Sequence, residues 1–168
     1  ERPDLVCIEG HPLNLAVKAI RTALRTFEYV AGEEIVEDAY LHEAIRGKVY
    51  RFSDGKALRC DTTASALKLA SGRKPPVRIL TAGRVFRPDP EGRRTAKVFH
   101  QLEGLHIGTD ATPELMKDAV ARAVRSYLPS IEICWESATC AGFEDELNGV
   151  VNHNGEKTGI FGCGMMNG

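Results

Sequence analysis

The sequence lacks the features of several specialised protein classes. No apolar run approaches the roughly 20 residues that a membrane-spanning helix needs, and no leader-like segment is visible. Lysine and arginine number 22 against 23 acidic residues, so the formal net charge is −1. The chain therefore has no overall positive charge that would indicate nucleic-acid binding. Any contact with RNA would be confined to a local patch. We expect a cytoplasmic protein with no membrane partner.

The cysteines also lack the spacing of a staple or a metal site. The chain has five of them, an odd number, and no two form a C-x-x-C pair: Cys7, Cys60, Cys134, Cys140 and Cys163. This pattern favours thiols in a reducing compartment over a disulfide framework. A zinc site is the less favoured alternative, because no paired Cys/His spacing supports it. The sequence predicts no resident metal.

What the chain does contain is typical of one globular domain over residues 1–168, with 43% hydrophobic and 27% charged residues. Apolar spacing predicts helices over 11–27 and 113–128, and a third helix, capped by Asp61 or Thr62, that runs through Ala64, Leu67 and Leu69. Extended segments are predicted at 33–38, 77–87, 97–107, 131–135, 149–153 and 158–165, with a hairpin around Asp54-Gly55. Hairpins imply antiparallel pairing, and no βαβ rhythm is present. We therefore predict an α+β fold, an antiparallel sheet with helices mostly on one face.

The segments 77–87 and 97–107 concentrate the residues that could carry chemistry. Because side chains alternate along a strand, Arg87, Phe99, Gln101 and Glu103 are expected to share one face. Arginine can clamp a phosphate, phenylalanine can stack on a base, and the amide and carboxylate can receive an ammonium group. The loop between the strands adds cations suited to a polyphosphate: Arg93, Arg94 and Lys97. The alternative is a structural hairpin with solvated charges on its outer face.

The same stretch resembles a known family. Gly83-Arg-Val-Phe-Arg87, a nine-residue spacer and Lys97-Val-Phe-His-Gln-Leu-Glu-Gly104 look like motif 2 of class II aminoacyl-tRNA synthetases. The F-H-Q-L-E-G string is similar to the catalytic alpha subunit of phenylalanyl-tRNA synthetase, as is the late Gly162-Cys-Gly-Met-Met166. The resemblance implies an antiparallel sheet of the class II synthetase type, flanked by helices.

The resemblance also implies roles for individual residues in amino-acid activation, the attack of an amino-acid carboxylate on magnesium-bound ATP to give an aminoacyl-adenylate. Arg87 would contact the ATP α-phosphate as the catalytic residue, and Phe99 would stack on adenine. Asp89 would hold the adenine side, and Arg93 and Arg94 would cover the phosphates. The amino-acid site would comprise Asp61, Thr63, Gln101, Glu103 and Phe143. Implied partners are the amino acid, ATP, tRNA, and either a second copy or another synthetase-type subunit.

The chain departs from the family pattern at several points. The G-x-G-x-E-R segment of motif 3 is absent, which leaves a chain truncated at its C-terminus and a natural core without that segment as alternatives. The histidine of the family's H-T-S is Asp61, and the family's F-P-F-T-E corresponds loosely to Cys140–Asp145, where Phe143 is the only aromatic residue. An acid with small neighbours favours a more polar or cationic substrate than phenylalanine.

Three functions stay open on the sequence. The first is a phenylalanyl-like synthetase core that forms an aminoacyl-adenylate. The second is a synthetase paralogue that ligates an amino acid to a carrier other than tRNA, favoured by the altered pocket residues. The third is a non-catalytic, dimerising or amino-acid-sensing subunit, favoured by the missing motif 3.

Overall fold

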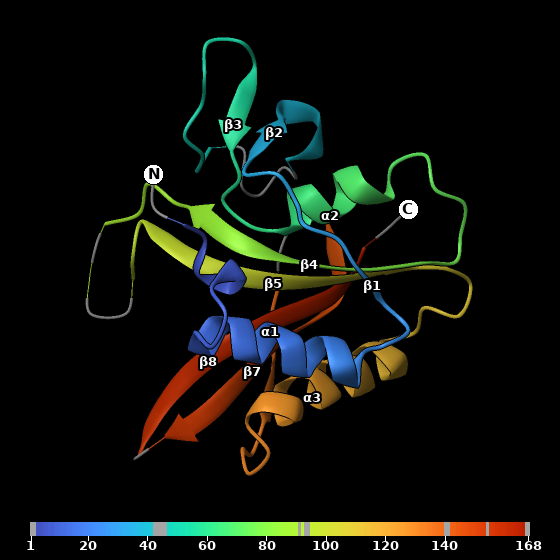
Figure 1. The fold of residues 1–168 in the computed structure, drawn as a ribbon. Helices are drawn as coiled ribbons and strands as arrows, with labels where there is room; N and C mark the ends of the chain where they lie inside the picture. The colour runs from blue at the N-terminus through green and yellow to red at the C-terminus, as the bar shows by residue number, and fades with distance from the viewer. Residues whose placement is uncertain are drawn as a thin grey trace.

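The computed structural model describes residues 3–41, 47–90, 92, 95–139, 142–153 and 155–166. This part of the chain forms three α-helices, each followed by two or three strands, and eight strands in all (Figure 1). In chain order the elements are the 3-10 turn η1 (Leu5–Cys7), α1 (Pro12–Ala23), β1 (Glu28–Tyr29), β2 (Ile35–Glu37), the 3-10 turn η2 (Asp38–Tyr40), β3 (Lys56–Leu58), α2 (Thr63–Ala70), β4 (Val77–Phe86), β5 (Val98–Ile107), α3 (Pro113–Tyr127), β6 (Cys134–Ser137), β7 (Phe143–His153) and β8 (Glu156–Met166). The prediction of an α+β fold is confirmed.

The antiparallel hairpin of β4 and β5 runs through the centre of the molecule (Figure 1). Its register is regular over its whole length, from Val77 opposite Ile107 to Phe86 opposite Val98. The β4 strand is the more buried of the two, because β1 pairs with it in parallel along its other edge. The two-residue β1 was not predicted, since so short a strand has no periodic pattern of its own.

Helices cover both faces of this hairpin, so the prediction of helices mostly on one face is wrong. Ala82 packs with Val6 of η1 and Val17 of α1 on one face. Ile79 packs with Val77 and with Ala70 of α2 on the other. In the three-stranded sheet β1-β4-β5, the strand β4 is thus held from both sides by apolar contacts.

The first helix ends earlier than predicted, at Ala23 rather than near Phe27. His11 caps its start, because the Nδ1 atom accepts a hydrogen bond from the amide of Leu13 at 3.2 Å. After Ala23 the chain turns, and the amide of Phe27 bonds the Leu24 carbonyl at 2.8 Å. This turn lets β1 reach the edge of β4, so tertiary pairing overrides the helical apolar spacing.

The predicted turn at Asp54-Gly55 is present, and Gly55 adopts a φ of +81°, which favours glycine. Only the second arm forms a regular strand, β3, which pairs with β2. The first arm contributes an isolated bridge between Arg51 and Ala57. The chain leaves this small sheet at Leu58 and leads directly into α2, which brings residues 59–63 beside the hairpin.

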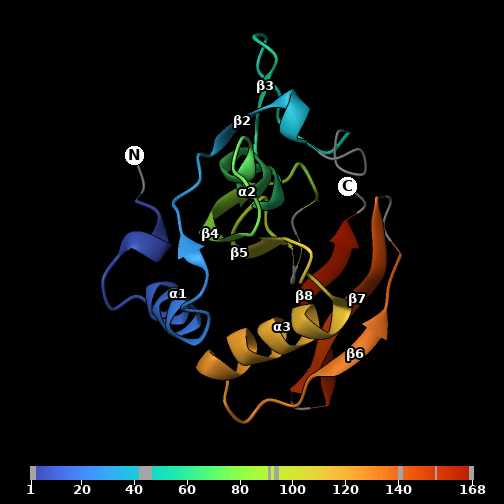
Figure 2. The same cartoon turned by 90° about the vertical axis from the view of Figure 1, so that its right-hand side faces the viewer.

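The C-terminal part forms a second three-stranded antiparallel sheet, in the order β6-β7-β8 (Figure 2). The helix α3 starts at Pro113 after a Thr112 cap and packs beside α1 and against β8. The three segments predicted as extended at 131–135, 149–153 and 158–165 all fall in or beside this sheet, although β7 begins earlier, at Phe143. Within the described ranges, no helix is long and apolar enough to cross a membrane.

Gly149 has no side chain and so leaves room for an aromatic contact in this second sheet. It lies opposite Trp135 in β6 and Phe161 in β8, and the two aromatic rings meet edge to face with centroids 5.1 Å apart. A Cβ at Gly149 would lie 1.9 Å from the Phe161 ring. The ring therefore occupies the space above the glycine, where aromatic cover compensates for the glycine's weak strand propensity.

Gly149→Ala is therefore expected to displace the Phe161 ring and to lower the free energy of unfolding by about 1–3 kcal/mol, the usual cost of overpacking. Urea denaturation monitored by Trp135 fluorescence measures the loss. The matched control is Gly159→Ala in β8, where a Cβ meets no atom within 4 Å. Equal effects of the two substitutions would show that the ring contact is not the cause.

Candidate active site

One face of the β4–β5 hairpin gathers the polar residues that the sequence singled out. The register pairs Val85 with Phe99 and Thr81 with Glu103, and Gln101 lies between these pairs on β5. Side chains at alternate positions of one strand share a face, so Phe99, Gln101 and Glu103 lie in a row. Arg87 follows β4 and continues the ladder, because its amide donates to the Lys97 carbonyl at 2.8 Å. The predicted grouping is therefore present.

The guanidinium of Arg87 is held in two ways. Its carbon lies 4.9 Å from the centroid of the Phe99 ring, a cation–π distance. Its Nε donates a hydrogen bond to the carbonyl oxygen of Cys60 at 2.9 Å. Within the described residues, no acceptor bonds the two Nη atoms of Arg87. A guanidinium fork can bind an anion such as a phosphate bidentately.

Glu103 is the most strongly perturbed carboxyl group of the face. Its pKa is raised to about 7, chiefly by burial and to a smaller extent by the neighbouring carboxylate of Asp61. Hydrogen bonds from the hydroxyls of Thr63 and Thr62 act in the opposite direction, and the Thr62 contact measures 3.5 Å. A cation from outside the chain would relieve the cost of ionising this group, which makes it a natural receptor for an ammonium group.

Asp61 is buried at the start of α2 and has a structural partner there. Its Oδ1 accepts a hydrogen bond from the amide of Ala64 at 3.3 Å, within the first turn of the helix. The carboxylate therefore satisfies an otherwise unpaired helix amide, and it also lies close enough to Glu103 to raise that group's pKa. The predicted proximity of Asp61, Thr63 and Glu103 is thus present.

Gln101 carries a buried acceptor. Its Oε1 has no hydrogen-bond partner among the described residues. Buried acceptors without partners are uncommon in native proteins, so this atom calls for a donor from a ligand or water. It lies between Phe99 and Glu103 along β5, where an amino group bound at Glu103 would find a second acceptor.

Not every predicted site residue joins this face. Asp89 lies in the loop after β4 and is partly buried. Phe143 begins β7, opposite Met166 of β8, and so belongs to the other three-stranded sheet. Arg93 and Arg94 lie outside the described residues. Their assignment to ATP binding stays a prediction, as do the roles of the other site residues.

The structure adds one group that sequence reasoning missed, the Cys60 carbonyl that orients Arg87. A backbone acceptor has no residue-type signature, and it is found only when the segment between β3 and α2 is placed. The thiol of Cys60 is itself buried, which raises its pKa to about 12. It is one of four free cysteines among the described residues. No group of three His, Cys, Asp or Glu side chains in the described ranges is placed to hold a metal ion.

The chain is similar to several known proteins. The alpha subunit of phenylalanine–tRNA ligase from Xylella fastidiosa (strain 9a5c) is 30% identical over 129 residues, which are 70% of this chain and 38% of that protein. The same subunit from Legionella pneumophila (strain Paris) is 31% identical over 170 residues, which are 83% of this chain and 48% of that protein. This chain therefore spans about half or less of the length of these relatives.

Among solved structures, PylSc of Desulfitobacterium hafniense, a pyrrolysyl tRNA synthetase, superposes with a TM-score of 0.64. The superposition covers 82% of this chain and 54% of that synthetase chain. The sequence identity is 19%, so the likeness shows the fold alone. The sequence profile of the family described as "tRNA synthetases class II core domain (F)" matches residues 16–168. The chain belongs to this class II tRNA synthetase core family.

Proposed function

We propose that this chain activates an amino acid with ATP and forms an aminoacyl-adenylate. The observation that carries the proposal is the stacked Arg87–Phe99 pair on the same hairpin face as the half-buried Glu103, whose carboxyl pKa is raised. The pair offers a cation and an aromatic plate for a nucleotide, and Glu103 offers an anion for an ammonium group. The fold family, whose name includes tRNA synthetases, supports the same chemistry.

The chemistry would proceed by placement and charge stabilisation. The amino-acid carboxylate oxygen attacks the α-phosphorus of ATP, the bond to the β,γ-diphosphate breaks, and pyrophosphate leaves. Arg87 would hold the α-phosphate oxygens and offset the charge that develops on them. Phe99 would stack on adenine, with Asp89 at the adenine side and Arg93 and Arg94 over the phosphates. Magnesium, bound through phosphate oxygens, would supply further charge neutralisation.

The amino acid would sit at the Glu103 end of the face. Its ammonium group would lie between the Glu103 carboxylate and the orphaned Gln101 oxygen, with Asp61 and Thr63 beside it. Phenylalanine is the amino acid named in the curated relatives. The carboxylate of Asp61 adds a second negative charge, which favours an amino acid with a polar or cationic side chain. Phe143, from the other sheet, is proposed as a further wall of this pocket.

Pyrophosphate exchange into ATP, run with each of the twenty amino acids and magnesium, tests the proposal. One amino acid is expected to give exchange well above the others. Exchange followed by charging of tRNA supports a synthetase, and exchange without charging supports a ligase that acts on another carrier. Binding of an amino acid in calorimetry with no exchange would overturn the proposal in favour of a sensing subunit.

We also propose a cytoplasmic protein that works with tRNA and with a second copy or a second synthetase-type subunit. The curated relatives are named as alpha subunits of tRNA ligases, which supports a partner chain. Two large apolar side chains are available for such a contact: Leu15 on α1 is 49% exposed and Ile35 on β2 is 44% exposed. Both lie in the N-terminal region, where we propose the contact with the partner chain.

A further inference from the structure

Arg59 is the largest side chain that the described part of the chain buries completely, with 1% of its surface exposed. It lies between β3 and α2, two residues before Asp61. A buried guanidinium is costly unless its donors are paired. Burial lowers the pKa of Arg59, and the carboxylates of Glu34 and Asp4 oppose that effect. So costly a group points to a specific task.

The guanidinium of Arg59 ties α2 to the end of β4. Its Nε donates to the carbonyl of Arg84 at 2.8 Å, and its Nη1 donates to the hydroxyl of Ser65 at 2.9 Å. The Ser65 hydroxyl in turn donates to the carbonyl of Glu33 at 3.1 Å. A lysine ammonium has no fork with which to reach two acceptors in fixed directions.

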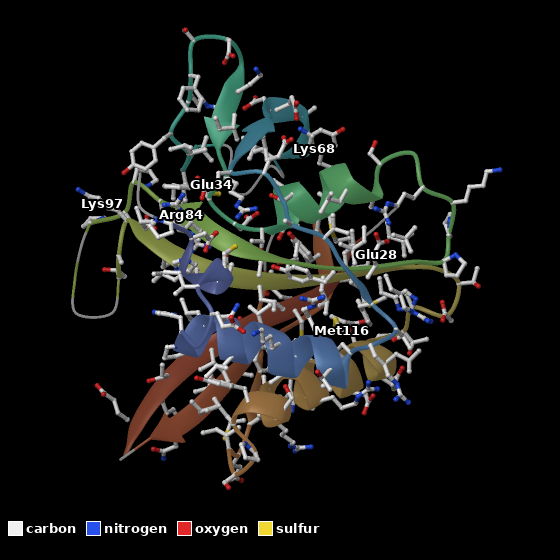
Figure 3. The ribbon with its side chains drawn as sticks, viewed as in Figure 1. Glu28, Glu34, Lys68, Arg84, Lys97 and Met116 are labelled. Atoms are coloured by element: carbon white, nitrogen blue, oxygen red, sulfur yellow. The ribbon has the colours of Figure 1, made fainter. Side chains whose placement is uncertain are left out.

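The main chain of Arg59 is fixed as well. Its amide donates to the Glu34 carbonyl at 2.9 Å, and its carbonyl accepts from the Phe86 amide at 2.9 Å. Glu34 also pairs with the side chain of Arg84 at 2.6 Å, and the labelled pair lies at the end of the hairpin in Figure 3. Residue 59 is thus bound at its amide, its carbonyl and its side chain.

Two glycines leave the space that this side chain fills. A Cβ on Gly83 would lie 2.3 Å from Nη2 of Arg59, and a Cβ on Gly32 would lie 3.0 Å from Nη1. Gly83 in addition has a φ of +153°. The chain therefore keeps both positions open around the guanidinium.

We infer that Arg59 is a positioning residue for Arg87. The residue after Arg59 is Cys60, whose carbonyl accepts the Nε hydrogen bond of Arg87. Because Arg59 is fixed at three points, the adjacent carbonyl is held in place, and it in turn sets the direction of the Arg87 fork over Phe99. The kinetic consequence of this role rests on the proposed function of Arg87 in ATP binding, whereas the hydrogen bond itself does not.

A double-mutant cycle in pyrophosphate exchange on the full chain tests the kinetic consequence. Arg59→Lys is expected to raise the KM for ATP about tenfold and to leave the KM for the amino acid within about twofold. In an Arg87→Met background, Arg59→Lys is expected to add less than about a twofold change. Equal effects on both KM values, or full additivity with Arg87→Met, would overturn the inference. Ile79→Val, in the buried β4 core, controls for lost thermal stability alone.

A second measurement needs no turnover and so separates this inference from the proposed function. Nuclear magnetic resonance of arginine Nε–H groups reports whether the Arg87 Nε proton is protected from exchange with water. Protection is expected in the wild type and in Ile79→Val, relative to the exposed Arg125, and its loss is expected in Arg59→Lys. Undiminished protection in Arg59→Lys would overturn the positioning role. A wild type that is inactive in exchange but shows this pattern would overturn the proposed function and leave the positioning role standing.

Discussion

Arg87→Met is expected to lower kcat/KM for adenylate formation about a hundred- to a thousandfold, as for loss of one preorganised donor to a developing oxyanion. The substitution keeps an apolar side chain beside Phe99 but removes the cation and the Nε hydrogen bond to Cys60. The loss is expected both as a higher KM for ATP, because Arg87 holds the α-phosphate of bound ATP, and as a lower kcat, because the charge on the phosphate oxygens grows in the transition state. Steady-state pyrophosphate exchange over a range of ATP concentrations measures both parameters.

Two matched variants sharpen this prediction. Arg87→Lys retains the charge but loses the planar fork, so an activity between wild type and Arg87→Met is expected. Arg125→Met removes an arginine from the exposed surface of α3 and is expected to change kcat/KM less than about twofold. If Arg87→Met retained activity within about threefold of the wild type, the hairpin face would not be the ATP site.

The hairpin could be predicted from the sequence because its determinants are local. Alternation along a strand has a fixed period of two, so the shared face of Phe99, Gln101 and Glu103 follows from their spacing alone. The position of Arg87 next to Phe99 follows as well, since an antiparallel pair with a closed register brings the two strand ends together. The motif resemblance then gave this face a chemistry that alternation does not specify.

The hydrogen bonds of Arg59 that hold Arg87 in position could not be predicted in the same way. Arg59 gives no periodic signal, and its partners are the Arg84 carbonyl and the Ser65 hydroxyl, which lie 25 and 6 residues further along the chain. Such contacts exist only after β4 and α2 are placed. The end of α1 was wrong for a related reason, because pairing of β1 with β4 outweighs the helical spacing of Phe27.

Asp61 shows how one residue can serve structure and site together. From the sequence it is an acid where the family has histidine, which suggests a cationic substrate. In the structure its carboxylate accepts from the Ala64 amide at the start of α2. The same charge raises the pKa of Glu103, so the helix contact and the electrostatics of the site are linked. A substitution at Asp61 would therefore alter both the helix contact and the electrostatics of the site. A substitution at Glu103 leaves the Asp61–Ala64 contact in place and so tests the site more directly.

Glu103→Gln is expected to remove a decline in stability between pH 4.5 and about pH 7. Burial raises the pKa of Glu103 from 4.5 to about 7, so the folded chain keeps a proton that the unfolded chain releases over this interval. The free energy of unfolding contributed by this carboxyl is present in full below pH 4.5 and is lost as pH rises through about 7. The loss amounts to about 3 kcal/mol, at about 1.4 kcal/mol for each pH unit.

Urea denaturation at intervals from pH 4.5 to pH 8 measures this contribution. The Glu103→Gln profile is expected to be flatter than the wild-type profile, and the variant is expected to be the more stable protein at pH 8. Glu114→Gln, which alters an exposed acid in the first turn of α3, is the control and should keep the wild-type slope. Parallel profiles for wild type and Glu103→Gln would show that this carboxyl ionises in the folded chain as it does in water.

The same titration should govern binding of the amino acid. An α-ammonium group at Glu103 requires the carboxylate, so binding must displace the proton that the folded chain holds below about pH 7. As pH is raised toward about 7, the affinity measured by calorimetry is expected to increase by up to about tenfold for each pH unit. Above about pH 7 it is expected to level off. Glu103→Gln is expected to bind weakly at every pH. Above about pH 7 the ionised Glu103 carboxyl lowers the free energy of unfolding of the ligand-free chain, and at the same pH it binds the ammonium group best. The bound ammonium group offsets that loss of stability.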